Sequence, residues 1–268
     1  FLNSISMKKT VIGMLAGMML VTLPGFGSRQ SARHRVRHAA SVNGASANDD
    51  SLREEKQLNK TPLVANGIHR LTESDYARVA EKLGVETAVI KAVVEIEAGK
   101  THQGFHAPGK PIINFDISMF RKFAGKKGIN LARYARTHAV VFSRPNAARY
   151  GSTQAAQHER LRVARSIDET VAIQGCFWGM FQIGGFNWRK CGCSSIQEFE
   201  KRMSESEASQ LELFADFVVN SGMLPALQAK NWSAFASKYN GSSYARRGYH
   251  TRLAAAYARY KSRFDNKS

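Results

Sequence analysis

From residue 71 to the end of the chain, apolar residues recur at intervals of three and four, which is the spacing of one face of an α-helix. Thr72 and Asp75 form a capping-box pattern at the start of the first such segment, and Gly84 supplies a stop at its end. A second helix is expected from Glu86 to Ala98. The sequence has no alternation of strands with helices, so a parallel α/β fold is excluded.

The rest of the chain continues this helical pattern. The further helices expected are Ser118–Phe123, Leu131–His138, Gln154–Arg165, Asp168–Gln174, Ser195–Met203, Glu205–Ser221, Trp232–Tyr239 and Tyr249–Phe264. Ser204 and Glu207 form a second capping pattern, and only Pro111–Phe115 has the character of a strand. The predicted fold class is therefore mainly α, with one domain over residues 71–268.

The charge of the chain is high for a protein of ordinary composition. It carries 39 Lys and Arg against 21 Asp and Glu, a formal net charge of +18, while hydrophobic residues make up 43%. That apolar share excludes a wholly disordered chain. Residues 71–268 alone carry a net charge of +12, so the expected domain is itself basic. Such an excess indicates a polyanionic partner: nucleic acid, an anionic membrane surface or an acidic cell-wall polymer.

The first residues have the pattern of a secretory signal peptide that starts at Met7. Two lysines follow Met7, an apolar stretch covers residues 10–23, and small residues allow cleavage after Gly27. We therefore expect residues 1–27 to be a removable signal, residues 28–70 to form a flexible basic linker, and the protein to be exported, to the periplasm or the medium. The apolar stretch is shorter than the roughly 20 residues that span a bilayer, so no stable membrane insertion is expected after cleavage. The alternative is an uncleaved anchor.

The second expected helix carries a carboxylate on its apolar face. Val93, Val94 and Glu97 share one side of this helix, whereas Glu95 lies about 200° from Glu97 and is expected in solvent. A carboxylate on an apolar face is costly unless it has a partner, and desolvation raises its pKa, as a general acid at neutral pH requires. Glu97 is therefore a candidate catalytic acid. The alternative is a structural Glu that pairs with Arg or Lys of a neighbouring helix.

Two later blocks have the composition of a sugar-binding surface. Residues 177–188 combine aromatic rings and glycines with the amides of Gln182 and Asn187. Glycines let the backbone approach a ligand closely, and rings and amides supply flat surfaces and hydrogen bonds. The alternative for this block is a tight turn in the core. Tyr239 and Asn240 then follow an apolar helix and precede a glycine, which is weaker evidence taken alone.

The cysteines and histidines give no metal-binding pattern. Cys191 and Cys193 are too close together for most metal sites, and the histidines are scattered, so neither a metal nor a cofactor is implied. In an exported protein Cys176 can pair with Cys191 or Cys193 and leave one thiol free. The alternative is three unpaired thiols.

In this order, the blocks resemble the N-acetylmuramidase family of peptidoglycan hydrolases, within the lysozyme-like superfamily. The matching stretches are Ala92–Glu97, Gly104–Phe105, Ile112–Asp116 with Phe120, Tyr150–Gly151, Phe177–Asn187 and Phe235–Gly241. The sequence departs from the usual family pattern in three places: Asp116 stands where Glu is usual, Ser118 where His is usual, and Phe177 where Ser is usual. The resemblance implies a mainly α, lysozyme-like single catalytic domain.

The resemblance also implies a substrate and roles for named residues. The substrate is the peptidoglycan glycan strand, cut at the β-1,4 bond between N-acetylmuramic acid and N-acetylglucosamine. Glu97 is implied as the general acid, and Asp116 is the candidate for the second carboxylate, acting as base or stabiliser.

Five further residues are implied in substrate binding. Gln182, Tyr239 and Asn240 are expected to hold the N-acetyl groups and hydroxyls of the sugars. Trp178 and Tyr150 are expected to shape the cleft, or else to fill the core.

Two other functions fit part of the pattern. A lytic transglycosylase uses the same acid Glu but lets the muramyl 6-hydroxyl attack, and it needs no second carboxylate. A non-catalytic module that binds wall glycans or nucleic acid would use only the charge. No nucleic-acid-binding motif is present, so we do not expect the protein to bind nucleic acid. We expect it to act on peptidoglycan strands as a monomer.

Overall fold

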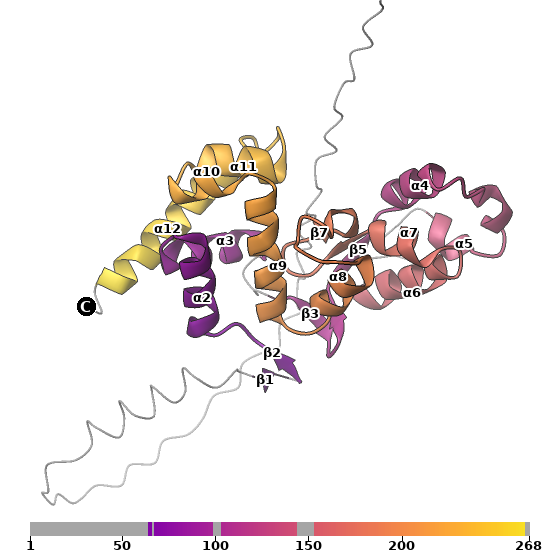
Figure 1. Cartoon of the computed structure of the whole chain (residues 1–268), viewed down its shortest axis with the longest axis horizontal. Coiled ribbons are helices and arrows are strands. Elements are labelled where there is room, and N and C mark those ends of the chain that lie inside the picture. The colour runs from indigo at the N-terminus through magenta and orange to yellow at the C-terminus, as the bar shows by residue number, and fades with distance from the viewer. Residues whose placement is uncertain (1–63, 66, 99–102, 144–152, 266–268) are drawn as a thin grey trace, which may run out of the picture.

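The computed structural model describes residues 64–65, 67–98, 103–143 and 153–265. The expected signal peptide (1–27), the linker as far as residue 63 and Tyr150 therefore lie outside the described residues. Figure 1 shows the helices in two groups, one built from the first and last helices of the chain and the other from its middle.

Helices dominate the described part of the chain. The α-helices are α2 (Glu73–Leu83), α3 (Thr87–Glu97), α4 (Ile117–Lys126), α5 (Ala139–Phe142), α6 (Gln154–Arg165), α7 (Glu169–Gln174), α8 (Ile196–Met203), α9 (Glu207–Asn220), α10 (Leu224–Gln228), α11 (Trp232–Asn240) and α12 (Tyr249–Asp265). Two 3₁₀ turns add η1 (Leu131–Tyr134) and η2 (Gly185–Asn187). The prediction of a mainly α fold is confirmed.

The strands are short and antiparallel. They are β1 (Val64–Ala65), β2 (Ile68–His69), β3 (Phe105–Ala107), β4 (Lys110–Pro111), β5 (Ile113–Phe115), β6 (Cys176–Trp178) and β7 (Ile183–Gly184). They form the hairpins β1–β2 and β3–β4 and a three-stranded sheet in the order β5-β6-β7. The single strand expected at Pro111–Phe115 is therefore shared between two sheets, and β6 and β7 come from the block rich in glycine and aromatic residues.

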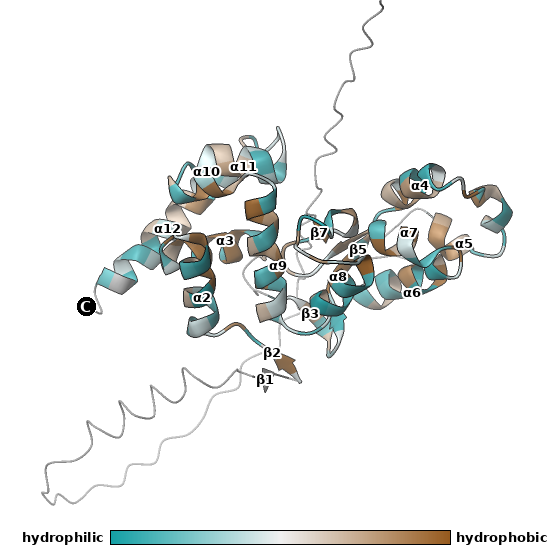
Figure 2. Cartoon of the chain, viewed as in Figure 1, coloured by the Kyte–Doolittle hydropathy of each residue, from teal (hydrophilic) through white to brown (hydrophobic). Residues whose placement is uncertain are grey.

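Helix α3 is the buried centre of the first group. Val89, Ile90, Val93 and Val94 are at most 1% exposed, because α2 and α12 pack along this helix. In Figure 2 the hydrophobic faces of the helices turn toward one another and the hydrophilic faces turn outward. The amphipathic pattern read from the sequence is thus the pattern of burial in this group.

The second group is built around the three-stranded sheet, whose outer strand β5 is completed by side chains of α6. The Gln154 amide accepts from Ile113 N at 2.8 Å and donates to Ile113 O at 3.1 Å. The amide oxygen of Gln157 accepts from Phe115 N at 2.9 Å. These bonds satisfy backbone groups that an edge strand would otherwise leave unpaired.

A buried carboxylate on α9 joins distant parts of the chain. Glu207 is 1% exposed and accepts hydrogen bonds from Arg70 Nη1 at 2.7 Å, Leu71 N at 3.3 Å and Gly104 N at 3.0 Å. Three residues along α9, Gln210 is also buried and donates to Gly104 O at 3.2 Å. The chain entering the domain and the segment before β3 are therefore held by the same turn of α9.

Two local predictions, a helix at Leu131–His138 and a helix cap at Ser204, were wrong. The helix expected at Leu131–His138 is only the 3₁₀ turn η1 followed by turns, and no η1 residue is buried, so packing does not stabilise a longer helix. The cap expected at Ser204 is made instead by Ser206, whose hydroxyl accepts from Ser209 N at 3.0 Å. Ser204 is the C-terminal cap of α8.

Glu95 is also not in open solvent. It is half-buried against α12, where it forms an ion pair with Arg259 and raises the pKa of Tyr260, a shift caused first by burial of that phenol. The helical wheel gave the angle between Glu95 and Glu97 but could not show that a second helix covers the Glu95 side. In the described part of the chain, no helix combines the length and the apolar character that crossing a bilayer requires.

Candidate active site

Glu97 is the last residue of α3, at the point where this buried helix ends. Its side chain is only partly exposed, and Asn240 Nδ2 donates a hydrogen bond of 3.2 Å to its Oε1. Burial raises the pKa of Glu97 to about 7, against the opposing effects of the Asn240 hydrogen bond and the positive charge of Arg252. Among the described residues its hydrogen-bond partner is an amide and not a cation, unlike the alternative of a structural ion pair. Near neutral pH this carboxyl can therefore carry a proton.

The Tyr239–Asn240–Gly241 motif ends α11 and brings the other two blocks together. Gly241 has φ +74°, a left-handed conformation that favours glycine and ends the helix. Asn240 is 6% exposed and faces Glu97, while the Tyr239 hydroxyl donates to Phe181 O at 2.6 Å. Burial, and then the charge of Glu97, raise the pKa of Tyr239. One helix end thus contacts both the candidate acid and the β6–β7 turn.

The β6–β7 turn has a strained backbone. Gly179 has φ +68°, and a Cβ there would lie 2.7 Å from Gln210 Oε1, so only glycine fits. Gln182 has φ +48°, which is uncommon for a residue with a side chain, and its amide donates to Gly179 O at 2.9 Å. Gln210 Oε1 accepts from Met180 N at 2.9 Å. The α9 side chain that holds Gly104 therefore also holds this turn.

An aromatic cleft of about 150 Å³ lies between these elements. Its lining is mostly apolar and comprises Met119, Phe177, Ile183, Gly184, Phe186, Asn187, Phe217 and Tyr239. The lining residues come from α4, from the sheet and η2, and from α9 and α11, so both groups of helices contribute to it. Flat rings with one amide are suited to a sugar. Glu97, Gln182 and Asn240 are not among the lining residues; Tyr239 lines the cleft, and the next residue, Asn240, contacts Glu97.

Trp178 does not line this cleft. It is 1% exposed, its indole N–H donates to Ile173 O at 3.1 Å, and its ring meets that of Phe199 edge to face. Because successive side chains of a strand point to opposite faces, Phe177 faces the cleft and Trp178 faces away from it. The burial of Trp178 agrees with the alternative that it fills the core. Phe177 and Phe186 were missed, and the strand alternation of β6 is the signal that finds Phe177.

Asp116 caps the N-terminus of α4. Its Oδ1 accepts from Ser118 N at 2.7 Å and Met119 N at 3.0 Å, and Met119 lines the cleft. The side chain is half-buried. Among the described residues no hydrogen bond joins Asp116 to Glu97.

The three thiols are unpaired and buried in the structure, which agrees with the alternative of three free cysteines. Burial raises the pKa of the Cys176, Cys191 and Cys193 thiols, so all three are poor nucleophiles. Across the described ranges, no group of three or more His, Cys, Asp or Glu side chains has the arrangement of a metal site.

The comparison with known families gives the same assignment as the three motifs. The sequence model of the N-acetylmuramidase family matches residues 86–261, from the start of α3 almost to the end of α12. The chain belongs to the N-acetylmuramidase family. It is therefore a glycoside hydrolase that acts on peptidoglycan.

A solved structure supports this membership. The chain is similar to the endolysin of the Burkholderia phage AP3, with 32% identity and a TM-score of 0.63 over 81% of this chain and 87% of that one. The lysozyme-like single-domain fold implied by the motifs is thus confirmed. No curated protein sequence matched the chain. Glu97 lies at the end of α3, Asn240 contacts it, and Tyr239 contacts Phe181 of the β6–β7 turn.

Proposed function

We propose that this muramidase cuts the β-1,4 bond between N-acetylmuramic acid and N-acetylglucosamine, with Glu97 as the general acid. The observation that carries the proposal is a carboxyl group with a pKa of about 7, held by Asn240 at the end of a buried helix beside an aromatic cleft. At neutral pH a large fraction of such a carboxyl group is protonated and can donate its proton. The group is also acidic enough to release that proton readily. Glu97 protonates the glycosidic oxygen as the bond breaks.

The remaining cleft residues bind the sugar and fix the geometry. Tyr239 and Gln182 hold the walls through their bonds to Phe181 and Gly179, and Asn240 orients the acid. The rings of Phe177 and Phe186 offer stacking surfaces for sugar faces. We assign Asn240 and Tyr239 to the subsite next to the cleaved bond.

The developing oxocarbenium ion needs a second group, and we assign Asp116 to it. The cap fixes one carboxylate oxygen, Oδ1, and leaves Oδ2 to activate a water. Retaining enzymes place their two carboxyls about 5 Å apart, and inverting enzymes about 6.5–9.5 Å apart. The anomeric configuration of the released product therefore distinguishes the two geometries.

One observation favours a lytic transglycosylase instead. The Asp116 carboxylate already has a structural task as a helix cap, and a transglycosylase needs no second carboxylate because the muramyl 6-hydroxyl attacks. The products distinguish the two reactions. Mass spectrometry of digested peptidoglycan shows reducing muramic acid ends after hydrolysis and 1,6-anhydro ends after transglycosylation.

The test of the acid is Glu97→Gln, which keeps the shape and the hydrogen-bonding capacity but cannot donate an acidic proton. We expect clearing of a cell-wall suspension to fall by at least about a hundredfold, the lower range for a general acid. Glu95→Gln is the matched control two residues earlier on α3, since Glu95 pairs with Arg259 of α12 and not with Asn240. Wild-type clearing by the Glu97 variant would falsify the assignment.

The domain plan of the chain belongs to the same proposal. Residues 1–27, with translation starting at Met7, act as a signal that exports the protein, and residues 28–70 connect this signal to the catalytic domain at 71–268. The end of that connection is structured, since β1 and β2 form a hairpin and Arg70 pairs with Glu207 of the domain. The basic domain is then attracted to the anionic wall. N-terminal sequencing of the protein from the culture medium or the periplasm tests this plan, and it predicts a start at Ser28.

A further inference from the structure

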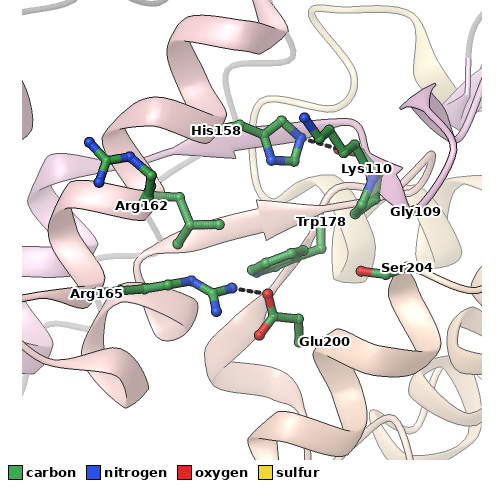
Figure 3. Close-up of a pocket in the computed structure, with 10 residues that line it drawn as sticks. Gly109, Lys110, His158, Arg162, Arg165, Trp178, Glu200 and Ser204 are labelled. Carbon is green, nitrogen blue, oxygen red and sulfur yellow. Dashed lines mark hydrogen bonds and ion pairs between the residues drawn. The ribbon is translucent and has the colours of Figure 1, made fainter.

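A second cavity lies across the sheet from the cleft. Its volume is about 350 Å³, and it is lined by Gly109, Lys110, Pro111, His158, Leu161, Arg162, Arg165, Trp178, Glu200 and Ser204. Trp178 belongs to this cavity and its neighbour Phe177 to the cleft, so the two sites open on opposite faces of β6. Figure 3 shows Lys110 and His158 on one side of the Trp178 ring and the ion pair of Arg165 with Glu200 on the other.

An adjoining cavity of about 240 Å³ extends this space into a groove. It is lined by His106, Lys110, Ala155, His158, Glu159 and Arg162. Lys110, His158 and Arg162 line both cavities, so the two lie next to each other. We call the two cavities together the basic groove.

Two of the cations in the basic groove are already paired. Arg165 forms an ion pair with Glu200, as the dashed line in Figure 3 shows, and Arg162 donates two hydrogen bonds of 2.6 and 2.8 Å to Glu159. Lys110 is exposed, and no carboxylate pairs with it among the described residues. The basic groove therefore offers a positive charge that the described protein groups leave uncompensated.

His158 adds a donor that depends on protonation. Its Nε2 donates to Pro111 O at 2.8 Å, which leaves Nδ1 toward the groove. Burial lowers the pKa of His158, and the positive charges of His106, Lys110 and Arg165 lower it further, against the effect of the Pro111 hydrogen bond. Arg162, Glu159 and Glu200 complete the charged groups that face the groove from α6 and α8. A bound anion would offset these cations and add a donor by favouring protonated His158.

We propose that the basic groove binds a phosphodiester polymer of the cell wall, as a second site separate from the catalytic cleft. The free donors are single points on different elements: Lys110 on β4, His158 on α6 and the Ser204 hydroxyl at the end of α8. Donors spread around a space suit a tetrahedral phosphate, whereas a planar carboxylate is matched by an arginine fork, and both forks here are already paired.

The groove also has surfaces for the carbon chain between phosphates. Leu161 and Pro111 form apolar parts of its wall beside the edge of Trp178. A membrane headgroup is less suited to this site, because Val219 is the single exposed large hydrophobic side chain in the described part of the protein. This inference rests on the proposed function in one respect: a protein that cuts peptidoglycan works at the cell wall, where the polymer is found.

The direct test is isothermal titration calorimetry of the full chain with a glycerol phosphate oligomer. We expect saturable binding, and we expect Lys110→Met to weaken it about tenfold, the loss of one charge-assisted hydrogen bond. Lys201→Met is the matched control, since it removes the same charge from exposed α8 surface outside the groove lining. Its Kd should change less than about twofold. Lack of saturable binding, or equal weakening by both variants, would overturn the proposal.

Two further arms separate this site from catalysis and from membranes. Glu97→Gln should bind the oligomer as the wild type does, whether or not Glu97 is the catalytic acid. Lys110→Met should hydrolyse phosphate-stripped peptidoglycan at the wild-type rate but clear phosphate-bearing walls more slowly. Binding to phosphatidylglycerol vesicles without binding to the oligomer would refute the wall polymer as ligand.

Discussion

The hydrogen bond from Asn240 to Glu97 makes a sharp prediction about pH dependence. This bond favours the ionised carboxylate and therefore opposes the burial that raises its pKa to about 7. Asn240→Leu keeps a similar volume and removes the donor. The pKa of Glu97 should rise, and the limb of the pH profile where activity is lost with increasing pH should move upward.

The size of the shift follows from the geometry. A hydrogen bond to a charged group contributes about 1.5–3 kcal/mol, and one pKa unit corresponds to about 1.36 kcal/mol. The bond is 3.2 Å long, at the weak end for N–H···O, so the lower figure applies. We expect the pKa of Glu97 to rise by about 1, which places the midpoint of the alkaline limb of the pH profile at pH ~8.

The assay is the pH dependence of kcat/KM on soluble muropeptide oligomers, which reports the free enzyme. Loss of sugar contacts by Asn240→Leu would lower the whole profile without moving its midpoint, so position and height separate the two effects. Asn220→Leu is the matched control, because Asn220 is exposed and bonds only Lys190 O among the described residues. An unmoved midpoint, or one at lower pH, refutes the reasoning.

Three further outcomes are expected. Glu97→Gln should stabilise the fold above pH 7 by up to about 3 kcal/mol. The pKa of Glu97 in the folded protein lies above the ordinary value of 4.5, so the stability that Glu97 contributes below pH 4.5 is lost as the pH rises through 7. Thermal melts at pH 5 and pH 8 measure this difference, and an equal gain at both pH values contradicts it. Asp116→Asn should keep the Tm, since Asn caps helices as well as Asp, but lower the hydrolysis rate, whereas Asp116→Ala should also cost about 1 kcal/mol; an Asn variant with full activity excludes Asp116 as the base. Raising salt should slow clearing of whole walls more than hydrolysis of a short soluble oligosaccharide, because screening weakens attraction to a polyanion; equal slowing argues against that attraction.

The sequence predicted the candidate acid because the signal was local. Glu97 stood out by its place on an apolar helical face, and its desolvation is the physical result of that position. The Tyr239–Asn240 motif was recognisable for a similar reason, as the end of an apolar helix. The contacts between these motifs could not be predicted from local patterns. The hydrogen bond between Asn240 and Glu97, for example, joins residues that lie far apart in the chain.

The failures came from contacts that no short-range pattern encodes. Whether Trp178 shapes the cleft or fills the core stayed open because the strand β6 was not predicted, and the opposite directions of Phe177 and Trp178 follow from that strand. Gln210 was missed although it holds both Gly104 and Met180, since a Gln on a partly apolar helix has no distinctive spacing. Its role is visible only when the two backbone segments are placed against α9.

The ion pair of Arg70 sets a limit on how far the N-terminus of this protein can be truncated. A shortened version that starts at residue 71 would remove the guanidinium group that Glu207 binds, and the buried carboxylate would then face Leu71 N and Gly104 N alone. Gly104 comes shortly after the end of α3 in the sequence, so we expect the loss of Arg70 to weaken the attachment of this segment to α9. A truncated muramidase intended for biochemistry or engineering should therefore begin before the β1–β2 hairpin.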